Sequence, residues 1–309
     1  MDTRRYIIDT DAGIDDLQAL FLALRHLNVV AITTVAGNVS VEKVTKNVTK
    51  VLEVSQKQIP IYCGAEMPLC KDIENAESYH GEDGIGDHEE IGKMEGCTEL
   101  INTTMSAAEF ILQEAQTEGL NMVCIGPLTN LAIAMTLDSS LSEKIENTYI
   151  MGGTLFGKGN IAPNKEFNFN FDPEATAKVI NNFKNMHIIP WEAAVDNPVP
   201  KKLEEAIFDK DAEGKLKFLA QANQKNFNEL KFFEICDGFA VLAIINPDLC
   251  TESYNLIAEA YTQGEAAGQI SYMWEKYCFA FDKKKVNCKV YHKFNMDECC
   301  DLLLQSLTE

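Results

Sequence analysis

Apolar residues recur along the chain in two alternating patterns, a short continuous run and a repeat at helical spacing. The short runs predict β-strands at residues 6–8, 29–35, 59–62, 120–125, 149–151, 187–191, 254–261 and 286–291. The repeats predict helices at residues 17–27, 41–54 and about 104–118, from 126–130 and 173 onward, across 198–231, at 238–245 and from 296. Because strands that alternate with helices are typical of βαβ units, we predict an α/β fold with an open, mainly parallel sheet flanked by helices.

The chain has 309 residues, of which 46% are hydrophobic, so it can bury a large core. No internal repeat or linker divides it, and we predict a single domain over residues 1–309. The net charge of -20 disfavours nucleic acid and anionic membrane surfaces as partners. With no signal peptide and no apolar run of about 18 residues, we expect a cytoplasmic protein. Its ten cysteines are then expected to be reduced thiols.

The most unusual stretch joins the first predicted strand to the first predicted helix, where Asp9, Asp11, Asp15 and Asp16 fall within eight positions. Two unit charges about 4 Å apart at an effective dielectric constant near 20 repel by roughly 4 kcal/mol, so these groups need protons or a cation. All-oxygen ligands favour calcium or magnesium over zinc. Helix capping accounts for one or two acidic residues but not for four. The turn therefore predicts a metal site that also accepts hydroxyl groups.

Other polar residues also follow predicted strands. They are Asn38, Thr129, the stretch from Asn160 to Asn168, and Asp237, which precedes a helix. Each one alone is as well explained by a loop amide or a cap, but the carboxyl ends of parallel strands share one sheet edge, so together they predict one pocket. By contrast, Asp172 is predicted to cap the helix that starts at Pro173, and His187 to be a strand residue and not a ligand.

Five motifs, in order, resemble those of the inosine-uridine nucleoside hydrolases. They are Asp9 to Asp16, Thr34 to Asn38, Gly126 to Asn130, Met151 to Gly153, and Glu166 to Ala175. The resemblance spans nearly the whole chain, and the acidic motif is highly specific. It implies the nucleoside hydrolase fold, a bound Ca²⁺ ion, and hydrolysis of the N-glycosidic bond of ribonucleosides to ribose and free base. It also implies a homodimer or homotetramer that acts in purine or pyrimidine salvage.

The resemblance also implies roles for individual residues. Asp11 would be the general base and, with Asp16, the main-chain carbonyl of Thr129 and Asp237, a calcium ligand, while Asp9 would support the cluster. The residues that would bind the ribose are Asp15, Asn38, Asn160, Glu166 and Asn168. A metal-bound water activated by Asp11 would attack the anomeric carbon through an oxocarbenium-like transition state, without a covalent intermediate.

Two positions depart from the family pattern. Ala12 stands where the family usually has Pro, which leaves the turn less rigid but removes no functional group. Cys236 stands where one branch of the family has a histidine thought to protonate the leaving base, and a thiol with a pKa near 8.5 is a poor substitute. Activation of the base could instead come from His80 in a stretch that resembles the family's His-Gly loop, from a stacked Trp191 or Trp274, or from solvent.

Two other functions compete with hydrolysis of nucleosides. A nucleoside- or ribose-binding protein of the same fold would keep the pocket with little or no turnover, which Cys236 makes conceivable. A magnesium-dependent phosphohydrolase of the haloacid dehalogenase type is suggested by Asp9-Thr10-Asp11 after a strand. That family expects Thr or Val shortly after the second Asp and a basic phosphate anchor, whereas this chain continues with Ala12-Gly13 and two further acids.

Overall fold

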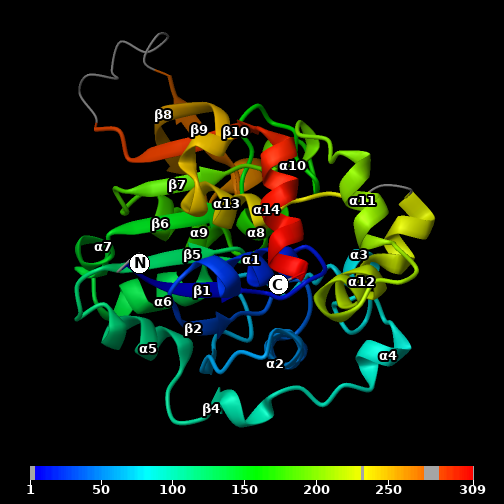
Figure 1. The fold of residues 1–309 in the computed structure, drawn as a ribbon. Helices are drawn as coiled ribbons and strands as arrows, with labels where there is room; N and C mark the ends of the chain where they lie inside the picture. Colours follow the sequence, from blue (N-terminus) through cyan, green and yellow to red (C-terminus); the bar gives the residue numbers. More distant parts are fainter. Residues whose placement is uncertain (1–3, 231–232, 275–284, 309) are drawn as a thin grey trace.

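The computed structural model of the protein describes residues 4–230, 233–274 and 285–308, and within them a ten-stranded sheet forms the centre of the molecule (Figure 1). In chain order the strands are β1 (Arg5–Thr10), β2 (Val29–Thr34), β3 (Ile61–Cys63), β4 (Ile101–Asn102), β5 (Leu120–Cys124), β6 (Asn147–Met151), β7 (Met186–Ile189), β8 (Cys250–Ala260), β9 (Ile270–Met273) and β10 (Cys288–Phe294). Their order across the sheet is β4-β3-β2-β1-β5-β6-β7-β10-β8-β9. All neighbours from β4 to β10 pair in parallel, and only β8 and β9 add antiparallel pairs. The predicted open, mainly parallel sheet is therefore confirmed.

Helices cover both faces of this sheet. They are α1 (Asp16–His26), α2 (Val41–Ser55), α3 (Glu77–His80), α4 (Glu89–Gly92), α5 (Ala107–Glu114), α6 (Thr129–Leu137), α7 (Leu141–Lys144), α8 (Phe167–Phe171), α9 (Pro173–Ile180), α10 (Glu192–Val195), α11 (Lys201–Ile207), α12 (Gly214–Leu230), α13 (Gly238–Ile245) and α14 (Met296–Thr308). Alternate residues of β1 enter two cores: Tyr6 and Ile8 pack with α1, α2, α13 and α14, whereas Ile7 packs with α5, α6 and α9. The sheet is thus the middle layer of three.

Several local predictions also agree with the structure. Asp172 caps α9, because its Oδ1 accepts a hydrogen bond of 3.0 Å from the Ala175 N–H. His187 is a residue of β7 and hydrogen-bonds the Tyr291 hydroxyl through Nδ1. The described cysteines, nine in number, are free thiols. No helix in the described part of the chain is long and apolar enough to cross a membrane.

The largest difference from the predicted elements lies between 198 and 231. The structure divides this stretch into α11 and α12, and residue 231 lies outside the described residues. The break covers residues 208–213, and α12 begins at Gly214, whose φ of +55° is in the left-handed region that glycine adopts readily. The strands at β4 and β9 were not predicted, since runs of two and four residues carry little periodic signal.

Candidate active site

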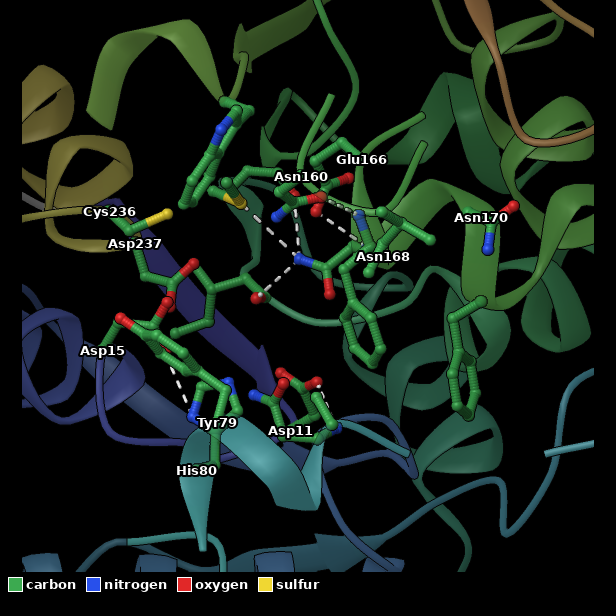
Figure 2. Close-up of a pocket in the computed structure, with 18 of the residues that line it drawn as sticks. Asp11, Asp15, Tyr79, His80, Asn160, Glu166, Asn168, Asn170, Cys236 and Asp237 are labelled. Atoms are coloured by element: carbon green, nitrogen blue, oxygen red, sulfur yellow. Dashed lines mark hydrogen bonds and ion pairs between the residues drawn. The ribbon is translucent and has the colours of Figure 1, made fainter. Parts of the chain in front are cut away.

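A cavity of about 560 Å³ opens at the edge of the sheet where the parallel strands end. Its lining includes Asp11, Asp15, Asn38, Tyr79, His80, Asn160, Glu166, Asn168, Trp191, Glu234, Cys236 and Asp237. Figure 2 shows Asp15, Cys236 and Asp237 on one side of the cavity, with Asn160, Glu166 and Asn168 on the other. Polar residues that follow separate strands, among them Asp11, Asn38 and Asn168, therefore line one pocket together with Asp237, whereas Thr129 does not belong to its described lining.

The turn between β1 and α1 supplies the acidic side of the cavity. Asp16, the first residue of α1, accepts hydrogen bonds from the Thr10 hydroxyl, the Gly13 N–H at 2.8 Å and the Asn38 amide at 3.3 Å. Ala12 has a φ of +31°, which the ring of a proline cannot adopt, so a proline does not fit this position of the turn. The turn is held by its own side chains and backbone and by Asn38, which follows β2.

Asp9 and Asp11 approach the site from the end of β1 and are almost fully buried. Asp9 Oδ1 accepts hydrogen bonds from the Thr33 hydroxyl and from the Asn130 amide at 2.8 Å. Asp11 Oδ2 accepts one of 2.9 Å from the Asn38 N–H. A Cβ atom on Gly126 would lie 2.8 Å from Asp11 Oδ1, so a glycine is needed beside this carboxylate.

Burial and mutual repulsion disfavour the charged forms of these acids. Burial raises the pKa of Asp9 to about 6, and burial together with the Asp15 charge raises the pKa of Asp16 to about 8. Burial first, and then the neighbouring carboxylates, raise the pKa values of Asp11 and Asp237 well above their usual range. The cluster therefore needs protons or positive charge to be stable.

The donor atoms fit a hard divalent cation. Among the residues that the structure describes, three buried carboxylate oxygens have no hydrogen-bond partner: Asp9 Oδ2, Asp11 Oδ1 and Asp15 Oδ1. One ligand atom each from Asp15, Cys236 and Asp237 lies within 4.8 Å of the others. Burial raises the pKa of the Cys236 thiol well above its usual value, so the sulfur stays protonated and is a poor ligand. The oxygen set is the one that calcium or magnesium prefers.

The predicted metal ligands are not all placed alike. Asp11 and Asp237 line the cavity, whereas Asp16 and Thr129 are buried and do not belong to its lining in the described part of the chain. The Thr129 hydroxyl donates a hydrogen bond of 2.8 Å to Asp172 Oδ2, so the side chain is engaged away from the acids. The charges of Asp15, Asp16 and Asp11 nevertheless all raise the pKa of Asp237, and a carboxylate oxygen of Asp15 lies within 4.8 Å of one of Asp237.

The five residues predicted to bind ribose all line the cavity. Glu166 caps α8, and both its oxygens accept backbone hydrogens: Oε1 from Asn168, and Oε2 from Gly153 and Phe169. The Asn168 amide in turn donates to the carbonyls of Ile125 and Met151, which follow or end β5 and β6. Backbone groups at the strand ends thus orient this side of the pocket.

A further group of residues forms the remaining wall. His80 Nδ1 accepts a hydrogen bond of 3.1 Å from the Ile14 N–H, and burial lowers the pKa of His80, so its ring is neutral with the proton on Nε2. It cannot donate from Nδ1 to Asp15 Oδ1, 3.8 Å away. Trp191 lines the cavity, whereas Trp274 lines a separate one beside Tyr272.

Two residues of this wall were missed by the sequence analysis. The Tyr79 hydroxyl donates a hydrogen bond of 3.1 Å to Glu234 Oε1, across 155 positions of the chain. The available signals were positional: Tyr79 directly precedes His80 of the predicted His-Gly loop, and Glu234 lies two residues before Cys236. Neither position has a residue type that by itself indicates a site.

Comparison with known proteins identifies a family whose sequences resemble this chain. The sequence model described as "Inosine-uridine preferring nucleoside hydrolase" matches residues 6–301. The chain is 40% identical over 178 residues to a non-specific ribonucleoside hydrolase, RihC, of Klebsiella pneumoniae and 39% identical to that of Salmonella typhi, covering 57% of this chain and of each relative. The chain thus spans a little over half the length of these curated relatives in the matched region.

Solved structures agree over a longer extent. An inosine-guanosine nucleoside hydrolase superposes with a TM-score of 0.89 at 28% identity, covering 99% of both chains. A purine-preferring ribonucleoside hydrolase from Gardnerella vaginalis has a TM-score of 0.86 at 22% identity, covering 98% of both chains, which supports the fold alone. The fold, the order of the motifs and the family match lead to one conclusion: the chain belongs to the inosine-uridine preferring nucleoside hydrolase family.

Proposed function

We propose that this protein hydrolyses the N-glycosidic bond of ribonucleosides, releasing ribose and free base, with Ca²⁺ as its cofactor. The observation that carries the proposal is the placement of buried Asp11 and Asp237 and half-buried Asp15 opposite Glu166 and Asn168 across one cavity (Figure 2). The family membership and the names of the relatives support the same reaction.

The size and lining of the cavity suit a nucleoside. Its volume of about 560 Å³ lies within the usual range for small-molecule sites. Carboxylates and amides at one end can accept and donate hydrogen bonds to sugar hydroxyls. At the other end, Tyr79 and Trp191 offer aromatic surface to a planar base, and Cys236, whose sulfur lies within 4.8 Å of a carboxylate oxygen of Asp15 and of Asp237, adds a weakly polar group at the border with the acids. The two ends match the two halves of the substrate.

The residues that would hold the calcium ion are Asp11, Asp16, Asp237 and the main-chain carbonyl of Thr129. The unpartnered Asp11 Oδ1 is consistent with this role, because a buried carboxylate oxygen normally has a partner. When bound, the ion supplies the positive charge that the cluster lacks and lowers the pKa of water in the site. Asp9, with its hydrogen bonds to Thr33 and Asn130, would support the cluster from behind.

In the proposed reaction Asp11 takes a proton from the water that attacks the anomeric carbon. The Asn38 N–H donates to Oδ2 and so fixes the orientation of the Asp11 carboxylate in the cavity lining, where it acts as the base. The residues proposed to hold the sugar are Asp15, Asn38, Asn160, Glu166 and Asn168. Their negative charge and oriented amides stabilise the positive charge that develops on the ribose in an oxocarbenium-like transition state.

The finer physiological setting belongs to the same proposal. We infer a cytoplasmic homodimer or homotetramer that acts on small ribonucleosides in purine or pyrimidine salvage, without nucleic-acid or membrane partners. The net charge of -20 supports the last point, since polyanions would be repelled.

The proposal is tested by incubating the calcium-loaded protein with inosine, adenosine, guanosine, uridine and cytidine, and measuring free base and ribose. Equal amounts of base and ribose from at least one nucleoside are expected. Nucleoside binding by calorimetry without ribose release would instead indicate a binding protein. Phosphate release from a phosphomonoester, with none of these nucleosides cleaved, would indicate the phosphohydrolase.

A further inference from the structure

Departure of a base from ribose leaves negative charge on the base nitrogen, so hydrolysis is accelerated when a nearby group donates a proton. The base end of the cavity has three candidates other than solvent: Cys236, His80 and Glu234. The question is which of them has a transferable proton and a free direction in which to donate it.

Two of these candidates have protons that are hard to remove. Burial and the surrounding carboxylates raise the pKa of the Cys236 thiol well above its usual value, so the thiol is a weak acid. His80 Nδ1 accepts the Ile14 N–H, and the neutral ring retains only its Nε2 hydrogen. A neutral imidazole can donate a hydrogen bond from Nε2, but it does not release that proton near pH 7. Neither group is an effective general acid.

Glu166 is a useful contrast to Glu234. Both are glutamates of the cavity lining, and burial raises the pKa of each to about 7. In Glu166, however, both oxygens accept backbone N–H groups, which leaves it the role of an acceptor. In Glu234, Tyr79 donates to Oε1, and the described residues provide no donor to Oε2. Oε2 is thus the oxygen that can carry a proton.

Hydrogen bonds from two long helices, α1 and α12, hold the backbone at Glu234 and at Tyr79. The Gln18 amide of α1 donates a hydrogen bond of 2.9 Å to the Glu234 carbonyl. The Asn226 amide of α12 donates one of 3.0 Å to the Tyr79 carbonyl. Tyr79 also packs edge-on against His80, with ring centroids 4.9 Å apart. These contacts hold the Tyr79 hydroxyl and the Glu234 carboxyl in one place on the cavity wall.

We propose that Glu234, positioned by Tyr79, is the general acid that protonates the leaving base, an inference that rests on the proposed hydrolase function. As the bond between the anomeric carbon and the base nitrogen breaks, the bonding pair goes to the nitrogen, which takes the proton from Glu234 Oε2. The water that forms the new bond to carbon gives its proton to Asp11. Glu234 then regains a proton from solvent and Asp11 releases one, so the net reaction consumes one water. The Tyr79 hydrogen bond stabilises the carboxylate left on Glu234.

The test compares Glu234→Gln with the wild type on two substrates. Inosine needs a proton on its leaving base, whereas 4-nitrophenyl β-D-ribofuranoside releases a stable phenolate without one. Glu234→Gln is expected to lower kcat on inosine by about 100-fold or more, since general acid catalysis contributes about 10²–10⁴-fold. On the nitrophenyl riboside the loss is expected to stay below about 3-fold. The retained activity also shows that the variant is folded.

Tyr79→Phe gives a second readout. Activity on inosine requires protonated Glu234 and therefore falls as pH rises through the pKa of Glu234, about 7 in the wild type. The Tyr79 hydrogen bond lowers this pKa, whereas burial and the Asp15 charge raise it. Removing the hydroxyl is therefore expected to raise the pKa of Glu234, so that activity on inosine is lost at a higher pH than in the wild type. The ionisable groups that bear on Glu234 are Tyr79, Asp15 and Cys236.

Glu205→Gln is the matched control: Glu205 is exposed, pairs with Lys201 and does not line the cavity, so both activities are expected to stay at the wild-type level. Cys236→Ala tests the thiol as the rival proton donor. Equal losses on both substrates in Glu234→Gln, no loss on inosine, or a selective loss on inosine in Cys236→Ala would each overturn the assignment of Glu234. A wild-type protein that cleaves neither riboside would overturn the hydrolase function itself. If the wild type is active and Glu234→Gln loses the same activity on both substrates, only the role of Glu234 as general acid is overturned.

Discussion

The two ends of the cavity are built in different ways. The sugar end, formed by Asp11, Asp15, Asn38, Glu166 and Asn168, is set by turns at the ends of parallel strands and by backbone hydrogen bonds. The base end, formed by Tyr79, Trp191, Glu234 and Cys236, combines α3, the start of α10 and the segment before α13. Tyr79 and Glu234 meet there through one side-chain hydrogen bond.

The two ends differ in how strongly charge and geometry restrict the residue types that can occupy them. At the sugar end, packed carboxylates must be balanced by charge, and the oxygens must keep their directions, so few residue types fit. At the base end the groups are neutral or weakly acidic, and a proton can come from more than one position. A thiol at 236 is therefore tolerable if Glu234 supplies the proton.

The largest effect is expected from Asp11→Asn at the sugar end. Loss of the general base should lower kcat by about 1,000-fold or more on inosine and on the nitrophenyl riboside alike, since both reactions need an activated water. The fold should persist, because removing one of several repelling buried charges relieves repulsion. Steady-state kinetics and circular dichroism measure the two effects.

The matched control for this substitution is Asp138→Asn. Asp138 follows α6, pairs with Lys144 at 2.6 Å and does not line the cavity. It should leave kcat unchanged. Asp11→Asn activity within about tenfold of the wild type would contradict the role of Asp11 as a general base with that expected contribution.

Much of the sugar end was predictable because its residues lie in short contiguous motifs after apolar strands. Asp11, Asp15 and Asn38 follow β1 and β2 directly, and parallel topology then brings them together. The fold was predictable for the same reason, since long apolar runs alternate with helical repeats. The break at residues 208–213 was not, because polar helical sequence on both sides concealed it.

The base end could not be predicted in the same way. The Tyr79–Glu234 pair joins positions 155 apart, and no local spacing indicates that they meet. Trp191 and Trp274 were equivalent alternatives in sequence, and only the packing of β8 and β9 places Trp274 in another cavity. Side-chain pairs formed by tertiary packing carry no periodic signature.

The pH dependence of stability offers a second way to sharpen the comparison. In calcium-free protein the raised pKa values of Asp9, about 6, and Asp16, about 8, mean that the folded state binds more protons than the unfolded state between about pH 4 and pH 8. Stability should therefore fall as pH rises across that window, with the melting temperature decreasing by about 5–10 °C from pH 5 to pH 8.

Added calcium should reverse this trend, because a cation binds the deprotonated carboxylates and gains affinity as they ionise. Thermal melts at pH 5, 6, 7 and 8, with chelator and with millimolar calcium, measure both slopes. Glu234→Gln at the base end should leave the calcium-dependent difference in place. Identical melting curves with and without calcium at pH 8 would contradict the proposal that this site binds calcium.

The smallest effect is expected from the aromatic residue of the base end. Trp191 lines the cavity, and its backbone N–H donates a hydrogen bond of 2.9 Å to the Gly153 carbonyl, which fixes the start of α10. If its ring stacks on the base, a contact worth about 1–3 kcal/mol, Trp191→Ala should raise KM for inosine about tenfold. Its effect on kcat should be much smaller, because stacking serves the ground state and the transition state alike.

Trp274→Ala is the paired control: its ring packs against Phe156 beside a different cavity, so KM should not change. Equal increases in KM for both variants would mean that they act through the fold, and the base end would then have no stacking residue at 191.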